Sequence, residues 1–323
     1  MIGKVDPELL RELVFDRIGV ADERVLQGAA YGEDTAAIEL GEEILVINTD
    51  PISLAVERLG TLAVAVACND VAASGGSPEW MTNVLFLPDD DEATLDVVTE
   101  QLDREAERLG VAIVGGHSEY LPALSTPMLV TSCFGLADEY VPTAGARPGD
   151  RILVTKGAGI EGTAILATDF RQRLEGTVDE SVFERAETFY DEIGVMTEAA
   201  ILTEYATAMH DPTEGGLAAG LYEVAAAAGV ELEVDIDAIP IRDETAELCA
   251  AAGVDPLGIF GSGALVATLP GGTTERVQSE LERRGIESAV IGTVEPTATP
   301  RVRLGDRTID APVRDDMYAL WED

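Results

Sequence analysis

The chain has 323 residues, 46% of them hydrophobic, which is enough apolar material for a folded core and suits two domains better than one. Asp and Glu number 61 against 21 Lys and Arg, giving a formal net charge of -40. A surface this acidic excludes nucleic acid as a partner, because a phosphate backbone requires a basic face. No apolar run approaches the length of a membrane span, and the N-terminus has no secretory signal, so we expect a cytoplasmic protein.

The acidic residues are spread along the whole chain, and its only lysines are Lys4 and Lys156. In dilute salt such a charge opposes compaction. At about 1 M salt the screening length falls to roughly 3 Å and the repulsion largely disappears. The composition therefore predicts a halophilic protein. Three scattered cysteines without a CxxC pair argue against a disulfide framework or a structural zinc site.

The first half of the chain alternates strands with helices. A helix is expected over 7–15, an apolar helix without breakers over 59–73, and an amphipathic helix over 92–109. We expect strands over 44–48, 80–87, 111–114 and 128–136, the first ending at Thr49-Asp50-Pro51 and the third at Gly115-Gly116. Two βαβ-like stretches with a mixed sheet predict an α+β domain of ferredoxin type.

A turn-rich break at 144–150 divides the chain into predicted domains 1–147 and 148–323. The second half is expected to begin with a strand, to be mostly helical as far as residue 208, and to end in a charged surface segment. The predicted strands are 151–155, 231–236, 264–269 and 288–291, and the later helices are 218–228, 245–252 and 274–284.

Short acidic motifs stand at the ends of several predicted elements. Asp34 can be a turn residue, Asp50 a strand terminator and Asp211 a helix cap, and for most acids of this chain solvent exposure is the simplest interpretation. Asp70 differs, because it interrupts an apolar helix and should be at least partly buried. A buried, unpaired carboxylate favours a cation partner, and Mg²⁺ prefers carboxylate and phosphate oxygens.

The sequence contains neither a phosphate-binding loop of the GxxxxGK[ST] kind nor a GxGxxG after a strand. In a chain that avoids lysine, Lys4 and Lys156 are candidates for a compact positive charge against phosphate, with chance retention as the equal alternative. The only histidines, His117 and His210, each adjoin a motif; a hydrogen-bonding role is favoured over catalysis for both.

Taken in order, these motifs resemble the superfamily of aminoimidazole ribonucleotide synthetase, selenophosphate synthetase, thiamine-monophosphate kinase and the hydrogenase-maturation carbamoyl dehydratase. The likeness covers nearly the whole chain and is strongest to the hydrogenase-maturation member. Its motifs are GEDTAA from Gly32, Thr49-Asp50, NDVAASGGSP from Asn69, Gly115-Gly116-His117-Ser118, and MHDPTEGGLAAGLYEVA from Met209.

The resemblance implies a ferredoxin-like first domain whose sheet forms a barrel with its twin in a homodimer. It also implies a second α/β sandwich domain that closes over ATP and Mg²⁺. The implied metal ligands are Asp34, Asp50, Asp70 and Asp211. The implied nucleotide-binding residues are Thr49, Asn69, Gly115, Gly116, His117 and Thr213. The implied catalytic residues are Lys4, Asp211 and Glu214, with Lys4 meeting the ATP phosphates from a flexible N-terminal arm.

Two departures bear on the reaction. No cysteine follows Cys249, although the carbamoyl dehydratase carries its substrate on a C-terminal cysteine, and the Cys-and-Lys glycine loop of selenophosphate synthetases is missing. We therefore expect a Mg-ATP-dependent enzyme that phosphorylates or activates a small substrate at a carbonyl or amide oxygen. The alternatives are a small-molecule kinase and a nucleotide-binding regulatory or scaffold protein. The expected partners are a second copy and the substrate, with a maturation protein as a further candidate.

Overall fold

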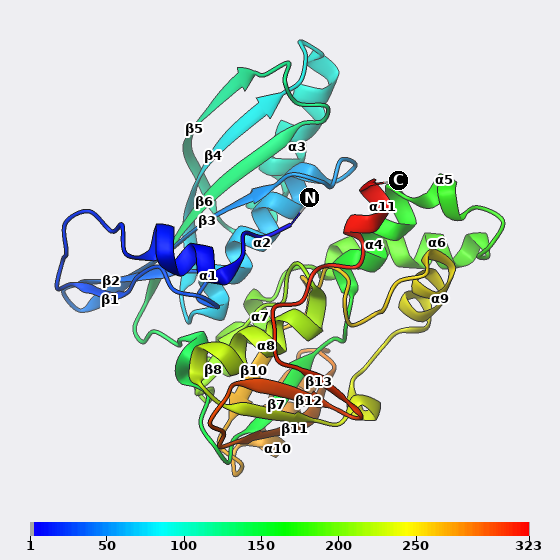
Figure 1. The fold of residues 1–323 in the computed structure, drawn as a ribbon. Helices are drawn as coiled ribbons and strands as arrows, with labels where there is room; N and C mark the ends of the chain where they lie inside the picture. Colours follow the sequence, from blue (N-terminus) through cyan, green and yellow to red (C-terminus); the bar gives the residue numbers. More distant parts are fainter. Residues whose placement is uncertain (1–2, 323) are drawn as a thin grey trace.

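The structure, a computed structural model, describes residues 3–322 as an α+β protein with two mixed β-sheets, drawn above and below in Figure 1. The first sheet has the order β1-β2-β3-β6-β4-β5. Its strands are β1 (Val25–Gln27), β2 (Ala36–Leu40), β3 (Glu43–Ile52), β4 (Ser77–Leu87), β5 (Ala112–Tyr120) and β6 (Met128–Ala137). Its helices are α1 (Pro7–Leu10), η1 (Arg11–Phe15), α2 (Leu59–Ala73) and α3 (Glu92–Leu109).

The ferredoxin-type prediction for this sheet is wrong in its connections. The chain runs β3-α2-β4-α3-β5-β6, whereas a ferredoxin-like unit runs βαββαβ. The β4–β5 pair is parallel, and β6 returns antiparallel into the gap between β3 and β4. The prediction of an α+β domain with two helices holds, because α2 and α3 agree with their predicted ranges to the residue.

In the first sheet, β3 and β5 continue well beyond their predicted ends. Pro51 lies inside β3, where residues beyond Ile47 pair only with β6, and a strand with one unpaired side tolerates a proline. Gly116 lies inside β5, where a Cβ would come within 2.4 Å of the Asn83 carbonyl oxygen on β4. In both places the neighbouring strand, and not the local sequence, decides where the strand ends.

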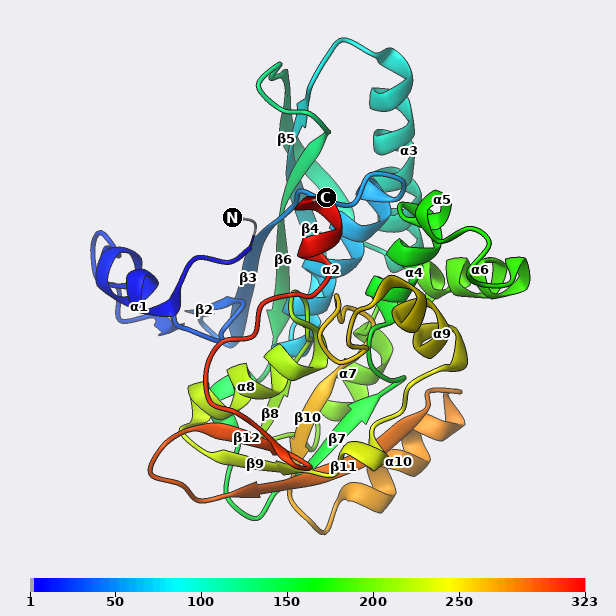
Figure 2. The ribbon, with the colours of Figure 1, turned by 45° about the vertical axis from the view of Figure 1, so that its right-hand side comes forward.

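Helix α2 is buried along almost its whole length because it packs on both halves of the molecule. Val64 and Cys68 belong to the core of the first sheet. Leu62 and Ala65 pack with the helices of the second half. This double contact explains why the sequence of the helix is apolar all round, and Figure 2 shows α2 between the two sheets.

The second sheet has the order β13-β12-β9-β11-β7-β10-β8. Its strands are β7 (Arg151–Thr155), β8 (Ala208–His210), β9 (Glu231–Val234), β10 (Val266–Leu269), β11 (Ser288–Glu295), β12 (Arg301–Leu304) and β13 (Arg307–Ile309). The remaining helices are η2 (Thr143–Gly145), α4 (Ile160–Thr168), α5 (Arg171–Leu174), α6 (Glu180–Glu187), η3 (Thr188–Glu192), α7 (Met196–Leu202), α8 (Gly216–Ala228), η4 (Ile236–Ala238), α9 (Asp243–Ala252), α10 (Thr274–Arg283) and α11 (Tyr318–Glu322). The sequence did not predict five of the strands, namely β1, β2, β8, β12 and β13.

The prediction that the final segment lies on the surface is wrong. Strand β12 pairs in parallel with β9 and buries Val302, and Met317 packs in the core with α4 and α6. Figure 1 shows the segment crossing back from the second sheet to end beside the first half of the molecule. Within residues 3–322 no helix is long and apolar enough to cross a membrane.

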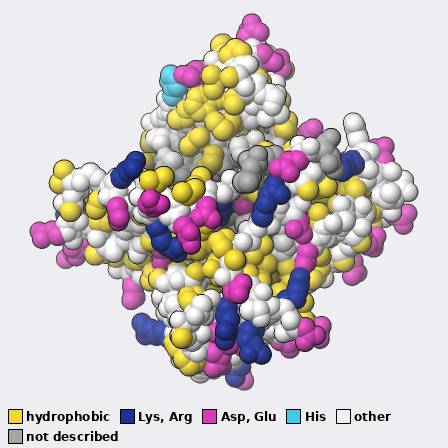
Figure 3. All heavy atoms as spheres, viewed as in Figure 1, with side chains coloured by type: hydrophobic (Ala, Val, Ile, Leu, Met, Phe, Trp, Pro, Cys, Tyr) yellow, Lys and Arg dark blue, Asp and Glu magenta, His cyan; other side chains and the backbone are white. Residues whose placement is uncertain are grey.

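No helix of residues 3–322 covers the upper part of the first-sheet face opposite α2 and α3, and much of this face is apolar. Trp80 pairs with Phe134, and Val84 with Val130, and all four side chains remain partly exposed. The edge strand β5 is exposed along its whole length. Figure 3 shows hydrophobic side chains gathered at the top of the molecule, over this sheet.

Candidate functional site

Three of the four predicted metal ligands meet between the two sheets. Asp34 precedes β2, Asp70 lies in α2, and Asp211 follows β8. Each offers a carboxylate oxygen, and these oxygens lie within 4.8 Å of one another. The cluster thus joins residues that are far apart in the sequence and come from both halves of the chain.

Asp70 is buried, as its position in an apolar helix predicts. Its side chain is 2% exposed, and Asn48 on β3 donates a hydrogen bond of 2.5 Å to its Oδ2. Burial, together with the charges of Asp211 and Asp50, raises the pKa of Asp70 well above its usual value. Among the described residues this carboxylate has a polar contact but no ion pair with a positive side chain.

Asp211 provides the test of whether the cluster fits a metal ion. It is 1% exposed, and neither of its carboxylate oxygens has a hydrogen-bond partner within residues 3–322. Burial and the charge of Asp34 raise the pKa of Asp211 to about 8. Buried polar atoms are almost always paired, and an all-oxygen donor set suits a hard dication. The residues present therefore fit Mg²⁺.

Asp50 lies beside the cluster on β3. Its carboxylate is within 3.4 Å of Asn48 Nδ2. Burial raises its pKa, as do the charges of Asp34 and Glu214, while a hydrogen bond with Asp70 and the charge of Lys4 lower it. The structure thus brings the fourth predicted ligand to the same place, next to the group of three.

The N-terminal arm lies over the same site, where the sequence analysis places Lys4. Lys4 Nζ is 3.4 Å from Glu214 Oε2 and 3.4 Å from Glu223 Oε1, and 3.5 Å from Thr213 Oγ1. Burial opposes its charge, but the carboxylates of Glu223, Glu214, Asp34 and Asp50 outweigh it and raise the pKa of Lys4. The ammonium stays charged, and its side chain remains 46% exposed.

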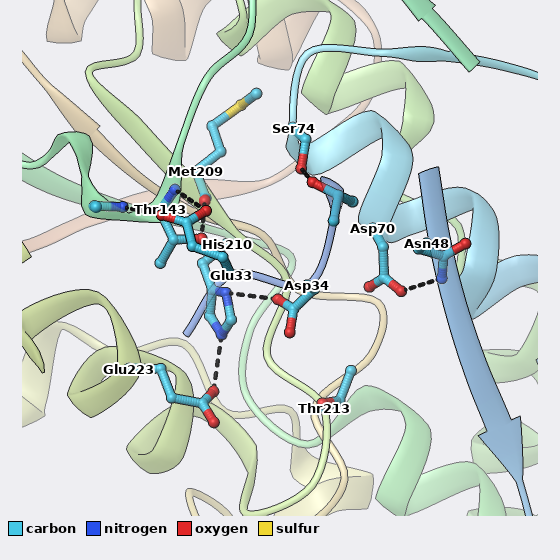
Figure 4. A network of polar contacts seen from close by, with 12 residues as sticks. Glu33, Asp34, Asn48, Asp70, Ser74, Thr143, Met209, His210, Thr213 and Glu223 are labelled. Carbon is cyan, nitrogen blue, oxygen red and sulfur yellow. Dashed lines mark hydrogen bonds and ion pairs between the residues drawn. The ribbon is translucent and has the colours of Figure 1, made fainter. Parts of the chain in front are cut away.

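His210 and Glu223 complete this polar network (Figure 4). His210 Nδ1 is 3.1 Å from Asp34 Oδ2, and its Nε2 is 3.0 Å from Glu223 Oε2. The ion pair with Lys4 and the hydrogen bond with His210 outweigh burial and lower the pKa of Glu223 to about 2. The sequence analysis missed Glu223, although it is a lone carboxylate in the apolar helix α8, the same signal that identified Asp70.

Thr49 and Gly115, two predicted nucleotide contacts, lie in one cross-strand row of the first sheet. Thr49 pairs with Ser132, Ser132 with Thr82, and Thr82 with Gly115. The hydroxyls of Thr49 and Ser132 are 2.8 Å apart. The row spans three strand spacings, roughly 14 Å, so Gly115 is remote from the carboxylates although it shares a row with Thr49.

Gly116 and His117 lie on the exposed edge strand β5, outside the carboxylate cluster. His117 Nε2 is 3.0 Å from Glu119 Oε2, and both side chains are largely exposed. The hydrogen-bonding role favoured for this histidine agrees with that contact. Binding of nucleotide by these two residues stays a prediction.

Asn69 makes contacts away from the cluster. Its Nδ2 donates to the Ile193 carbonyl at 2.9 Å, and its Oδ1 accepts from the Val195 N–H at 2.9 Å. The amide thus joins α2 to the segment before α7. This connection between the two halves of the molecule was not predicted, and a contact of Asn69 with nucleotide stays a prediction.

Lys156 is engaged within the protein and is not free for phosphate. Its Nζ donates to the carbonyls of Glu192 and Gly194, both at 2.8 Å, and forms an ion pair of 2.7 Å with Glu198. Lys156 is the one non-glycine residue with positive φ in the described part of the chain, at 58°. It lines a groove of about 870 Å³.

Two further buried acids lie behind the loop that carries Thr213 and Glu214. Asp315, in the C-terminal segment, accepts hydrogen bonds from the N–H groups of Gly215 at 2.7 Å and Met317 at 2.8 Å. Glu161 lies in the first turn of α4, and burial raises its pKa to about 7. Neither residue was singled out, because acids are too common in this sequence for one to stand out.

Comparison with known proteins agrees with the fold. Residues 32–137 match the AIR synthase related protein N-terminal domain, and residues 147–305 match the C-terminal domain of the same family. A selenide, water dikinase of Geobacter metallireducens is 32% identical, covering 80% of this chain and 75% of its own.

Hydrogenase-maturation proteins are also among the relatives. A putative hydrogenase expression/formation protein of Methanocaldococcus jannaschii is 26% identical over 98% of this chain and 96% of its own length. The carbamoyl dehydratase HypE of Rhodobacter capsulatus is 28% identical over 98% and 94%.

Solved structures show the same fold. AaThiL complexed with AMPPCP and TMP superposes with a TM-score of 0.76 at 21% identity, over 98% of this chain and 100% of that chain. A chain of the HypE–HypF complex gives 0.75 at 21%, over 94% and 99%. The motifs, both domains and the fold agree, and the chain belongs to the AIR synthase related protein family.

Proposed function

We propose that this protein is a Mg-ATP-dependent enzyme that phosphorylates or activates a small substrate at a carbonyl or amide oxygen. The observation that carries the proposal is Asp211, whose two buried carboxylate oxygens have no partner among the described residues and face Asp34 and Asp70. Asp34, Asp50, Asp70 and Asp211 would hold Mg²⁺, which when bound would supply the positive charge that these carboxylates and the phosphates of ATP require.

The surrounding residues support phosphoryl transfer. Lys4 stands over the cluster as a charged ammonium and would contact the transferring phosphate, as a preorganised positive charge does in such enzymes. Thr213 and Glu214 line the same side, and Thr49, next to Asp50 on β3, would contact the nucleotide. Relatives named as a dikinase and a dehydratase support ATP-driven activation as the shared logic.

The fate of the phosphoryl group separates this proposal from its main alternative. A small-molecule kinase would accumulate a stable phosphorylated product, whereas an activating enzyme would release phosphate as a second step proceeds. No step on a cysteine is part of the proposal, because Cys68, Cys133 and Cys249 are all buried.

The test is Mg-ATP binding by calorimetry at molar KCl, comparing the parent protein with Asp70→Asn. We expect the parent to bind Mg-ATP and the variant to lose most of its affinity, because Asn removes the ligand charge while keeping the shape. A folded Asp70→Asn protein with the affinity of the parent would refute the metal assignment. Screening metabolite pools for ATP-to-ADP conversion then identifies the substrate and excludes a regulatory protein without turnover.

A homodimer is proposed on the open face of the first sheet. Trp80, Val84, Val130 and Phe134 leave an apolar surface there without helix cover, and surfaces of this kind mark protein–protein contacts. In such a dimer two sheets would close a barrel, with Gly115, Gly116 and His117 near the subunit interface. Light scattering should give twice the mass of the chain, and Trp80→Glu should give monomers; a monomeric parent would refute the dimer.

The remaining proposals concern the environment of the protein. The likeness to HypE in complex with HypF supports a maturation protein as a further partner. Halophily is supported by the net charge of -40, and a cytoplasm rich in salt is its proposed location. Thermal melts from low to molar KCl should rise by many degrees, since screening relieves the repulsion; a flat profile would refute salt adaptation.

A further inference from the structure

The carboxylate of Asp34 is held by a single side chain. Its Oδ2 forms an ion pair of 3.1 Å with His210 Nδ1 that lacks hydrogen-bond geometry, and this carboxylate has no hydrogen bond and no second ion pair among residues 3–322. The Asp34 side chain is 34% exposed, in contrast to the fully buried Asp70 and Asp211. Without His210, Asp34 would be free to rotate into solvent.

The backbone on both sides of Asp34 is fixed independently of His210. The Glu33 carboxylate accepts hydrogen bonds from the N–H groups of Thr143 at 3.1 Å and Ala144 at 2.8 Å. The Thr35 hydroxyl is 2.7 Å from the Ser74 hydroxyl. His210 therefore sets the direction of one side chain and not the path of the loop, as the labelled residues in Figure 4 show.

His210 is itself fixed on two sides. Its Nε2 is 3.0 Å from Glu223 Oε2, and the side chain is 2% exposed. The backbone of α8 packs closely on the ring, since a Cβ at Gly220 would come within 3.2 Å of His210 Cδ2. These contacts fix the orientation of the imidazole ring, so that its Nδ1 faces Asp34.

We propose that His210, held by Glu223, is a positioning residue that keeps the Asp34 carboxylate where it joins Asp70 and Asp211 around a divalent cation. The inference rests on the proposed cation site and adds to it the residues that orient one ligand. A ligand oriented in advance binds more tightly, because binding then pays less ordering entropy. Contacts behind a metal ligand commonly change metal affinity by about 10–100-fold.

Two amide substitutions separate the two contacts of the ring. In His210→Asn the amide nitrogen replaces Nδ1 and keeps the contact with Asp34. In His210→Gln it replaces Nε2 and keeps only the contact with Glu223. With Mn²⁺ as the probe, measured by electron paramagnetic resonance and displaced by Mg²⁺, we expect His210→Asn to stay within about threefold of the parent and His210→Gln to bind roughly tenfold more weakly.

A second pair of variants tests the other end of the network. Glu223→Gln and Glu223→Ala remove the same charge, but only Gln can still accept a hydrogen bond from His210 Nε2. We expect Glu223→Gln to keep the Mn²⁺ affinity and Glu223→Ala to lose several-fold. Arg301→Gln, which breaks the ion pair with Glu231 on the second sheet, serves as the control and should change nothing.

The outcomes distinguish the two hypotheses. If the parent protein binds neither Mn²⁺ nor Mg²⁺, the proposed cation site itself is refuted. If the parent binds but the two folded members of each pair bind equally, the cation site stands and the positioning role is refuted. The Glu223 pair decides the question if a His210 variant fails to fold, because Glu223 lies on a helix and keeps some exposure.

Discussion

Two regions of the molecule bury charged side chains. In the carboxylate cluster these are Asp34, Asp70 and Asp211, and in the Lys156 pocket they are Lys156 and Glu198. Only in the pocket does the protein itself neutralise the charge. At the pocket, Glu198 meets the Lys156 ammonium at 2.7 Å, and two carbonyls take the remaining donors. At the cluster, Asp70 has an amide for a neighbour and Asp211 has no partner among the described residues. The difference separates a charge that the protein compensates from carboxylates that the described residues leave without a positive partner.

Removing one charged side chain should change the free energy of unfolding in opposite directions in the two regions. In the pocket, removing one partner leaves a buried charge alone, which is strongly destabilising. In the cluster, removing one carboxylate relieves repulsion among those that remain. Stability measurements on single variants can therefore separate the two regions before any substrate is known.

The largest expected effect is at the pocket. Lys156→Met should lower the free energy of unfolding by about 3–5 kcal/mol, because Glu198 would be left buried and unpaired. Denaturant titration at fixed salt measures it. Mg-ATP affinity should not change, since the ammonium is bonded within the protein. The double variant Lys156→Met, Glu198→Met should recover much of the loss; if it does not, packing of the lysine stem accounts for the effect.

At the cluster we expect the reverse. Without divalent cations, Asp70→Asn should raise the free energy of unfolding by about 1 kcal/mol or more, since it removes a carboxyl group whose ionised form is disfavoured by burial and by the charges of Asp211 and Asp50. Adding Mg²⁺ should stabilise the parent and leave the variant unchanged. A loss of stability in metal-free Asp70→Asn would show that the carboxylate is compensated within the protein, contrary to the comparison.

Glu161 extends the comparison to pH. Burial raises its pKa from 4.5 to about 7, so between these values the folded chain holds a proton that the unfolded chain has lost, and stability falls as pH rises. Glu161→Gln removes this cost. Melts at pH 5 and pH 8 measure the gain in free energy of unfolding that Glu161→Gln brings. This gain should be larger at pH 8 by about 2 kcal/mol. Equal effects at the two values would mean that Glu161 keeps an ordinary pKa.

The smallest expected effect is at Lys4. Lys4→Ala should lower the affinity for Mg-ATP and its turnover by about tenfold, roughly 1.4 kcal/mol, without loss of folding or dimerisation, because the side chain is half exposed. Lys4→Arg should restore part of the loss, since a planar fork replaces a compact charge. If Lys4→Ala turns over ATP as fast as the parent, Lys4 has no catalytic role and only forms surface ion pairs.

Local signals predicted the helices better than the strands. Helix α3 matches its predicted range because Asp91 caps its first turn and Gly110 ends it at φ 75°. Strands β3 and β5 continue past Pro51 and Gly116, because pairing with β6 and β4 supports residues that would end an isolated strand. Strand ends depend on neighbours that are distant in the sequence.

The candidate site shows the same division. The burial of Asp70 was predictable, because a charged residue inside an apolar helix stands out in the local sequence. Its neighbour Asn48 was not, since an amide in a strand carries no signal until β3 and α2 are placed together. Lys4 and Lys156 could not be told apart by sequence, because each is a rare lysine in an acidic chain. The fold separates them, since Lys4 lies over the carboxylates and Lys156 donates to backbone carbonyls.

The two hydrogen bonds of Asn69 have a mechanical consequence. They attach α2 to the segment that contains Ile193 and Val195. Asn69, which makes both bonds, is the residue before Asp70. A rotation of one half of the molecule against the other is expected to pivot close to this point, where displacements are smallest. The distance from Asp70 to Asp211 should then change little, while parts of the molecule far from Asn69 move most. The proposed cation site would thus keep its geometry while the two halves of the molecule move around it.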